Sequence, residues 1–128
     1  MFTTGMFTTQ GAFNGFSITD ADAAIGFYRD TLGLEVERNE MGFLDITLPS
    51  GARLLAYVKP DHEPASYTFL NFPVENVEAA VDELVAKGIT MLRYSGSPQD
   101  DKGIMRGHGP DIAWFTDPSG NVISVLAQ

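Results

Sequence analysis

The sequence predicts an α+β fold made of two tandem β-α-β-β-β modules. Short segments of alternating apolar and polar residues surround two helix-like segments, and the second half repeats the first. Residues 20–25 resemble residues 76–81 at an offset of 56, and the tripeptide Pro-Ser-Gly at 49–51 recurs at 118–120. Because neither half buries much apolar surface alone, we expect the two modules to share one core.

The first module follows from ordinary strand, cap and turn signals. Residues 12–18 alternate large apolar with small or polar side chains, as a half-buried strand does. Thr19 or Asp20 then caps a helix, and Gly33 ends it with the left-handed backbone that glycine favours. Further strands are expected at 34–38, 42–48 and 52–58.

The second module repeats this order after a polar linker at 59–66. A strand at 67–74 leads to a helix that Asn76 caps and Gly88 ends. An inserted loop, residues 95–109, is rich in glycine and charge. Further strands are expected at 89–94, 110–116 and 121–127.

The domain boundaries follow from the same signals. MFTTG is followed at once by MFTTQ, so Met6 is either a second start or part of a duplication that is not native. We expect residues 1–10 to form a tail and residues 11–128 a single domain, with module 1 at about 11–60 and module 2 at about 67–128.

Composition excludes several classes of function. The 128 residues carry 8 Lys+Arg against 17 Asp+Glu, a formal net charge of −9. An acidic surface repels phosphate and anionic lipid, so we expect no nucleic-acid partner and no membrane role. The absence of cysteine excludes disulfides, thiolate catalysis and cysteine-bound metals. Without a signal-peptide pattern or a long apolar run, a cytoplasmic protein is expected.

Two motifs make the sequence resemble the vicinal oxygen chelate superfamily, which includes glyoxalase I, bleomycin-resistance proteins and extradiol dioxygenases. They are FSITDADAAIGFYRDTLGLEV in the first half and the closing WFTDPSGNVISVLAQ, which holds an Asp-Pro-x-Gly-Asn hairpin. The resemblance covers residues 12–128. It implies a curved mixed sheet around a pocket, helices on the outer face and, usually, a homodimer. It does not settle the activity, because the superfamily hosts lyases, isomerases, dioxygenases and drug-sequestering proteins.

Enzymes of this superfamily hold a divalent metal through His or Gln on the first strand of each module and Glu on the last. The resemblance carries these positions onto Phe13 and Phe69, and onto Leu55 and Ser124, and the internal repeat supports the same mapping. Phe and Leu have no lone pairs for a metal, and one neutral hydroxyl cannot assemble a site. We therefore expect no metal and no cofactor, which disfavours metal-dependent catalysis.

Residues two apart on a strand share a face, so the mapped positions define the side chains that face the pocket. The opposite parity is apolar, as a helix-covered face should be. We expect a small organic ligand to contact Phe13, Ser17, Arg53, Leu55, Tyr57, Phe69, Asn71, Trp114 and Ser124.

Several of these residues also have a purely structural interpretation. Phe13 and Phe69 are candidates for core packing, and so is Trp114. Arg53 faces Asp45 across a hairpin, which favours a cross-strand ion pair over an anion-binding role.

The two histidines have different expected roles. His62 lies in the polar linker, where a solvated surface role is expected. His108 ends the inserted loop, which we expect to cover the pocket mouth, and it is the one candidate for a general base. Met105 and Arg106 in the same loop are further candidates for ligand contact.

The sequence thus predicts a metal-independent small-molecule-binding protein of the glyoxalase/bleomycin-resistance fold, with ligand or drug sequestration as one version. The alternative is a glyoxalase-like lyase or isomerase that uses a displaced metal site or His108 as a base. A third class is a partner-binding module whose cavity is filled.

Overall fold

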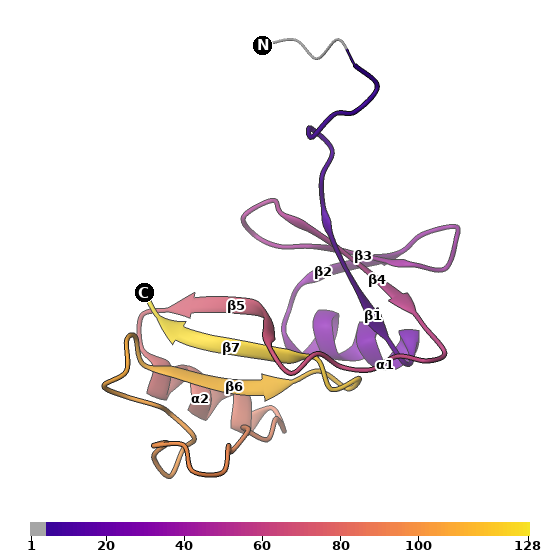
Figure 1. Cartoon of the computed structure of the whole chain (residues 1–128). Helices are drawn as coiled ribbons and strands as arrows, with labels where there is room; N and C mark the ends of the chain where they lie inside the picture. The colour runs from indigo at the N-terminus through magenta and orange to yellow at the C-terminus, as the bar shows by residue number, and fades with distance from the viewer. Residues whose placement is uncertain (1–4) are drawn as a thin grey trace. The chain divides into compact units, whose positions relative to one another are not determined.

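The computed structural model describes residues 5–128 and confirms the α+β fold class (Figure 1). The chain forms two compact units, one ending at Pro60 and the other formed by Asp61–Gln128. Each unit holds one mixed sheet and one helical segment, with four strands in the first sheet and three in the second. Among residues 5–128, no helix has both the length and the apolar character needed to cross a membrane.

The first unit is a four-stranded sheet in the order β1-β4-β3-β2. The first and last strands of the unit run parallel, with β1 at the edge of the sheet and β4 inside it, and the remaining pairings are antiparallel. The α-helix continues without a break into a π-helical turn, η1. The elements are β1 (Asn14–Ile18), α1 (Ala21–Ile25), η1 (Gly26–Thr31), β2 (Glu35–Arg38), β3 (Leu44–Thr47) and β4 (Arg53–Val58).

The predicted caps set the limits of this helical segment. The Asp20 carboxylate accepts a hydrogen bond from the backbone N–H of Ala23 at 3.0 Å, which confirms Asp20 as the N-cap. Gly33, with φ +78°, follows the last turn in the left-handed conformation that was expected. Tyr28 is fully buried and packs the segment against the sheet, where its ring forms an edge-to-face pair with Phe16 at 5.8 Å between ring centres.

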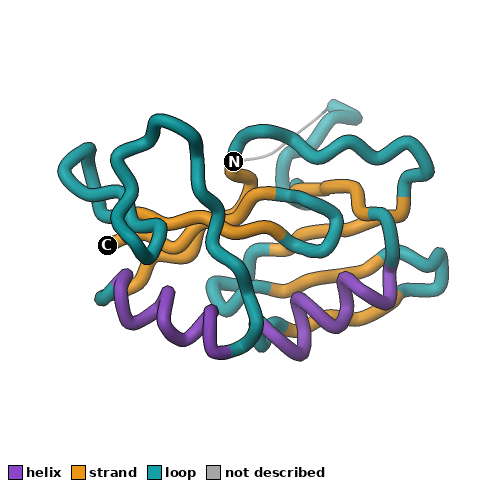
Figure 2. The backbone as a smooth tube through the Cα atoms, turned by 90° about the horizontal axis from the view of Figure 1, so that it is seen from below, coloured by secondary structure: helices purple, strands orange, loops and turns teal. Residues whose placement is uncertain are grey.

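The second unit is a three-stranded sheet in the order β5-β7-β6, with a helix along one face (Figures 1 and 2). Asn76 caps that helix by accepting from the N–H of Ala79 at 2.9 Å, and Gly88 follows its end with φ +93°. Both predictions are confirmed. The elements are β5 (Thr68–Val74), α2 (Val77–Ala86), β6 (Ile112–Thr116) and β7 (Val122–Ala127).

The strand predicted at 89–94 does not form, and this prediction was wrong. Only the N–H of Leu92 reaches β6, where it donates to the carbonyl of Trp114 at 2.8 Å. The Gln99 side chain takes the place of a neighbouring strand: its amide donates to the Leu92 carbonyl at 3.0 Å and accepts from the N–H of Tyr94 at 2.8 Å. Met105 pairs with the start of β6 through both of its backbone groups. The edge is therefore divided between two distant segments.

Candidate functional site

The first sheet aligns the predicted ligand-contacting residues on one face. Strand pairing places Gly15 beside Leu55, and Leu55 beside Asp45, in one row across three strands. Leu55 and Tyr57 on this face are half-buried, whereas Leu54 and Ala56 on the opposite face are buried. The expected division between a helix-covered apolar face and a more accessible face is confirmed here.

Arg53 lies between an aromatic ring and a carboxylate on the accessible face. Its guanidinium is 5.1 Å from the centre of the Phe13 ring and 3.6 Å from a carboxylate oxygen of Asp45. The ion pair with Asp45 is confirmed, although its length and exposure make it a weak one. The Phe13 residue is 51% exposed, so its interpretation as core packing was wrong.

The second sheet carries the equivalent row of Asn71, Ser124 and Trp114 on β5, β7 and β6. These three residues follow Gly15, Leu55 and Asp45 at the offsets of the internal repeat. The Ser124 hydroxyl is fully buried and donates to Oδ1 of Asn71 at 2.6 Å. Asn71 itself is exposed, and Trp114 is half-buried.

Two aromatic neighbours of the predicted residues were missed in the sequence. The rings of Tyr94 and Trp114 pack edge to face with their centres 5.5 Å apart, and those of Phe43 and Tyr57 do the same with their centres 6.4 Å apart. Phe43 lies at the parity of Asp45 just before β3, a signal that was available in the sequence. Tyr94 had no such signal, because its position depends on a strand that does not form.

Phe69 departs from the repeat. The register of β5 against β7 shifts between Thr68 and Leu70, so the one-to-one alignment of the repeat is interrupted at Phe69, whose side chain is half-buried. Ser17, by contrast, pairs in register with Tyr57 at the other end of β1 and is half-buried. The repeat thus matches the strand pairing at Asn71, whereas at Phe69 the register shift interrupts the match.

The residues at the family's four metal-ligand positions do not fit a metal. Phe13, Leu55 and Phe69 offer no donor atom, and the hydroxyl of Ser124 is already used by Asn71. No group of three or more His, Cys, Asp or Glu side chains among residues 5–128 could hold an ion elsewhere. The chain's own donor chemistry thus argues against the family's metal chemistry at these positions.

The inserted loop is held against α2 by two basic side chains. Lys102 contacts the carboxylate of Asp82 at 2.9 Å, and Arg106 contacts Glu78 at 3.2 Å and Asp111 at 2.8 Å. The hydrogen bond to Asp82 raises the pKa of Lys102. Arg106 is therefore engaged by acidic side chains, and the expectation that it contacts a ligand receives no support.

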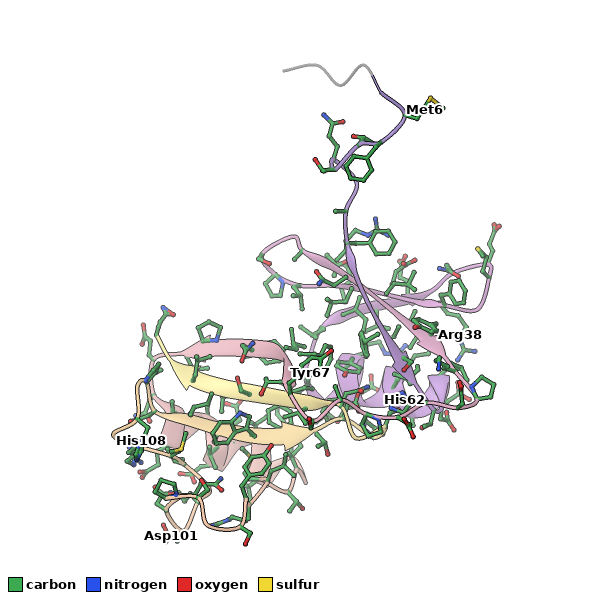
Figure 3. All side chains as sticks on the ribbon, in the orientation of Figure 1. Met6, Arg38, His62, Tyr67, Asp101 and His108 are labelled. Atoms are coloured by element: carbon green, nitrogen blue, oxygen red, sulfur yellow. The ribbon has the colours of Figure 1, made fainter. Side chains whose placement is uncertain are left out.

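The Asp100 carboxylate holds the inserted loop together through hydrogen bonds to the loop's own backbone. Burial opposes its ionisation, but hydrogen bonds from the backbone N–H groups of Ile104 and Lys102, both 2.9 Å, outweigh this and lower its pKa. His108 lies beyond these contacts, exposed between two glycines ahead of β6 (Figure 3). No carboxylate or carbonyl of residues 5–128 orients its ring, which weakens the case for a general base.

His62 is not the solvated surface residue that was expected. It is half-buried, and its Nε2–H donates to the carbonyl of Ser119 at 2.9 Å. Ser119 belongs to the closing hairpin turn, where the buried carboxylate of Asp117 accepts from the N–H groups of Ser119 and Asn121 and from the Asn121 amide, each at 2.9 Å. These contacts explain the Asp-Pro-x-Gly-Asn motif as a structural one.

The fold and the sequence place the chain in a known class. A family model described as Glyoxalase/Bleomycin resistance protein/Dioxygenase superfamily matches residues 14–125, and the chain belongs to that superfamily. No curated protein matches the chain.

Solved structures extend this likeness over nearly the whole chain. Hypothetical protein SA1046 from S. aureus has a TM-score of 0.71 at 16% identity, and the alignment covers 95% of this chain and 96% of SA1046. A glyoxalase family protein from Enterococcus faecalis has a TM-score of 0.65 at 24% identity, with coverages of 94% and 99%. TnmS3, an antibiotic binding protein from Streptomyces sp. CB03234, has a TM-score of 0.62 at 21% identity, with coverages of 94% and 98%. At these identities the likeness shows the fold alone.

Proposed function

We propose that this chain is a metal-independent small-molecule-binding protein, with sequestration of an organic compound as its role. The observation that carries the proposal is the replacement of metal donors at the four family positions. Phe13, Leu55 and Phe69 supply apolar surface instead, and Ser124 is committed to Asn71. A face of this composition suits an organic ligand better than an ion.

The side chains around these positions support binding. Aromatic rings on both sheets remain at least partly accessible, among them Phe13, Tyr57 and Trp114. Each unit also carries a polar group near its own rings, Arg53 in the first and Asn71 in the second, and apolar rings with a few polar groups are the usual make-up of a small-molecule site. The antibiotic-binding role in the name of TnmS3 shows that this fold can serve binding without naming a ligand for this chain. That the two modules enclose one pocket stays a prediction.

The first experiment asks what the purified full-length chain retains. Mass spectrometry of a denatured extract, together with metal analysis after dialysis, is expected to show an organic compound and less than stoichiometric metal. Retention of one divalent metal per chain would overturn the proposal.

Thermal-shift measurements with a panel of organic compounds provide the second test. Compounds that stabilise the chain are expected to lose their effect in Trp114→Ala. They should keep it in Phe7→Ala, which removes an aromatic ring that is 80% exposed outside both sheets. Equal losses in the two variants would contradict binding at Trp114.

We further propose that the protein is a homodimer, as the family resemblance implies. Light scattering coupled to size-exclusion chromatography measures the mass directly. A mass near twice 13.9 kDa is expected, and a mass near 13.9 kDa would rule the dimer out at the concentration used.

A further inference from the structure

The hydrogen bond between Ser124 and Asn71 holds an amide in one orientation. At 2.6 Å, the distance between the Ser124 hydroxyl and the Asn71 amide matches an O–H···O bond and is short for an N–H···O bond. The hydroxyl therefore donates to Oδ1. Because the Ser124 hydroxyl is fully buried, losing this partner would leave it unsatisfied, so the bond is strongly favoured.

This orientation leaves the donor end of the amide available. Asn71 is exposed, and among residues 5–128 no group accepts a hydrogen bond from its Nδ2. Two N–H donors are thus presented on the sheet face without a protein partner. A buried hydroxyl that holds an exposed amide is the arrangement expected of a polar group that recognises a ligand.

An aromatic surface lies on the same row. Trp114 stands opposite Asn71 across β7, and two strand spacings put them roughly 10 Å apart. The edge-to-face contact with Tyr94 holds the indole in place. A planar molecule of two or three fused rings spans such a separation, with its rings on the indole and one polar atom at the amide.

The charge of the protein indicates which kind of ligand atom accepts the hydrogen bond from Asn71. Nδ2 needs an acceptor, and carbonyl, carboxylate and ether oxygens all qualify. A carboxylate is disfavoured because Lys102 and Arg106, two basic residues of the inserted loop, are already paired with acidic side chains. The net charge of −9 also repels anions. A neutral carbonyl is the strongest acceptor that remains.

We infer that the second sheet binds a planar, uncharged aromatic carbonyl compound, with Asn71 Nδ2 donating to the carbonyl and Trp114 contacting the rings. Asn71 and Trp114 are the specificity-determining residues, and Ser124 is a positioning residue that acts through Asn71. This inference rests on the proposed function and adds the chemical class of the ligand.

A matched pair of probes tests the inference on the full-length chain. 9-Fluorenone and fluorene share one three-ring skeleton, but only fluorenone has a carbonyl. The chain has a single tryptophan, so quenching of its fluorescence reports binding at Trp114 directly. Fluorenone is expected to bind about threefold to tenfold more tightly than fluorene, the ratio that one net hydrogen bond supplies. The side-chain NH₂ resonance of Asn71 should shift with fluorenone only.

Two variants and one control separate recognition from general effects. Asn71→Asp places a hydrogen-bond acceptor against the carbonyl. It is expected to lower the affinity for fluorenone more than tenfold and to leave the affinity for fluorene unchanged. Ser124→Ala is expected to remove most of the preference for fluorenone. Asn76→Asp makes the same change in charge on the same unit, and because Asp caps helices as well as Asn it should alter neither affinity.

The outcomes distinguish this inference from the proposed function. Equal affinity for the two probes would overturn the inference while supporting binding of apolar molecules at Trp114. An unchanged fluorenone affinity in Asn71→Asp would overturn it as well, and so would a failure of both probes to quench Trp114. The proposed function would fall separately, through retention of a stoichiometric metal.

Discussion

The carboxylate of Asp117 is expected to stabilise the closing turn more than any other single polar side chain in the second unit. It is 3% exposed and accepts hydrogen bonds from the backbone N–H groups of Ser119 and Asn121 and from the Asn121 amide. Hydrogen bonds to a charged group contribute about 1.5–3 kcal/mol each in favourable cases, and water enters a turn more easily than a core. We therefore expect Asp117→Ala to lower the free energy of unfolding by about 3 kcal/mol.

Urea denaturation followed by Trp114 fluorescence measures this change, provided that the dependence on urea is the same in both proteins. The equivalent first-unit turn supplies the control. There the exposed Ser50 hydroxyl accepts only a 3.3 Å bond from the Ala52 N–H, so Ser50→Ala should cost less than about 0.5 kcal/mol. Asp117→Asn should be intermediate, because its Oδ1 still accepts from both backbone groups while its Nδ2 faces another amide donor. Equal effects of Asp117→Ala and Ser50→Ala would refute the reasoning.

The remaining predictions concern the two turns and the inserted loop. Gly51→Ala should lower the free energy of unfolding by about 1 kcal/mol, because φ is +94° but no atom lies near the added Cβ. Gly120→Ala should lower it by about 2–3 kcal/mol, because the added Cβ would also lie 3.1 Å from Cγ of Pro64. Denaturant unfolding of both variants tests this order. Arg106→Ala should speed amide hydrogen exchange in the inserted loop while changing global stability by less than about 1 kcal/mol, because the side chain is half-exposed, and uniform protection would contradict this. The lowered pKa of Asp100 means that its contribution to stability is present above the ordinary value of 3.8 and is lost as the pH falls through the folded-state value. The protection of the loop amides, measured relative to their intrinsic exchange rates, should therefore decrease over acid pH, and unchanged protection would oppose this.

The sequence by itself determined the elements that depend on neighbouring residues. Asp20 and Asn76 cap the helices, and Gly33 and Gly88 follow their ends, because caps involve groups only a few residues apart. Strand alternation and the internal repeat also predicted that Asn71, Ser124 and Trp114 share a face, and the strand pairing places them in one row. The family resemblance supplied the four metal-ligand positions, and the repeat supports that mapping. That three of them lack donor atoms is read from the sequence alone, since a side chain's donor atoms do not depend on the fold.

Only the tertiary structure decided where distant groups compete for the same partner. The segment at 89–94 has an apolar strand pattern, yet the Gln99 side chain takes the hydrogen bonds that a strand would have used. The docking of His62 on the closing turn and of Arg106 on the α2 acids likewise depends on residues far apart in the chain. Local pattern states what a segment can form, whereas the choice among long-range partners depends on which of them the folded chain brings within hydrogen-bonding distance.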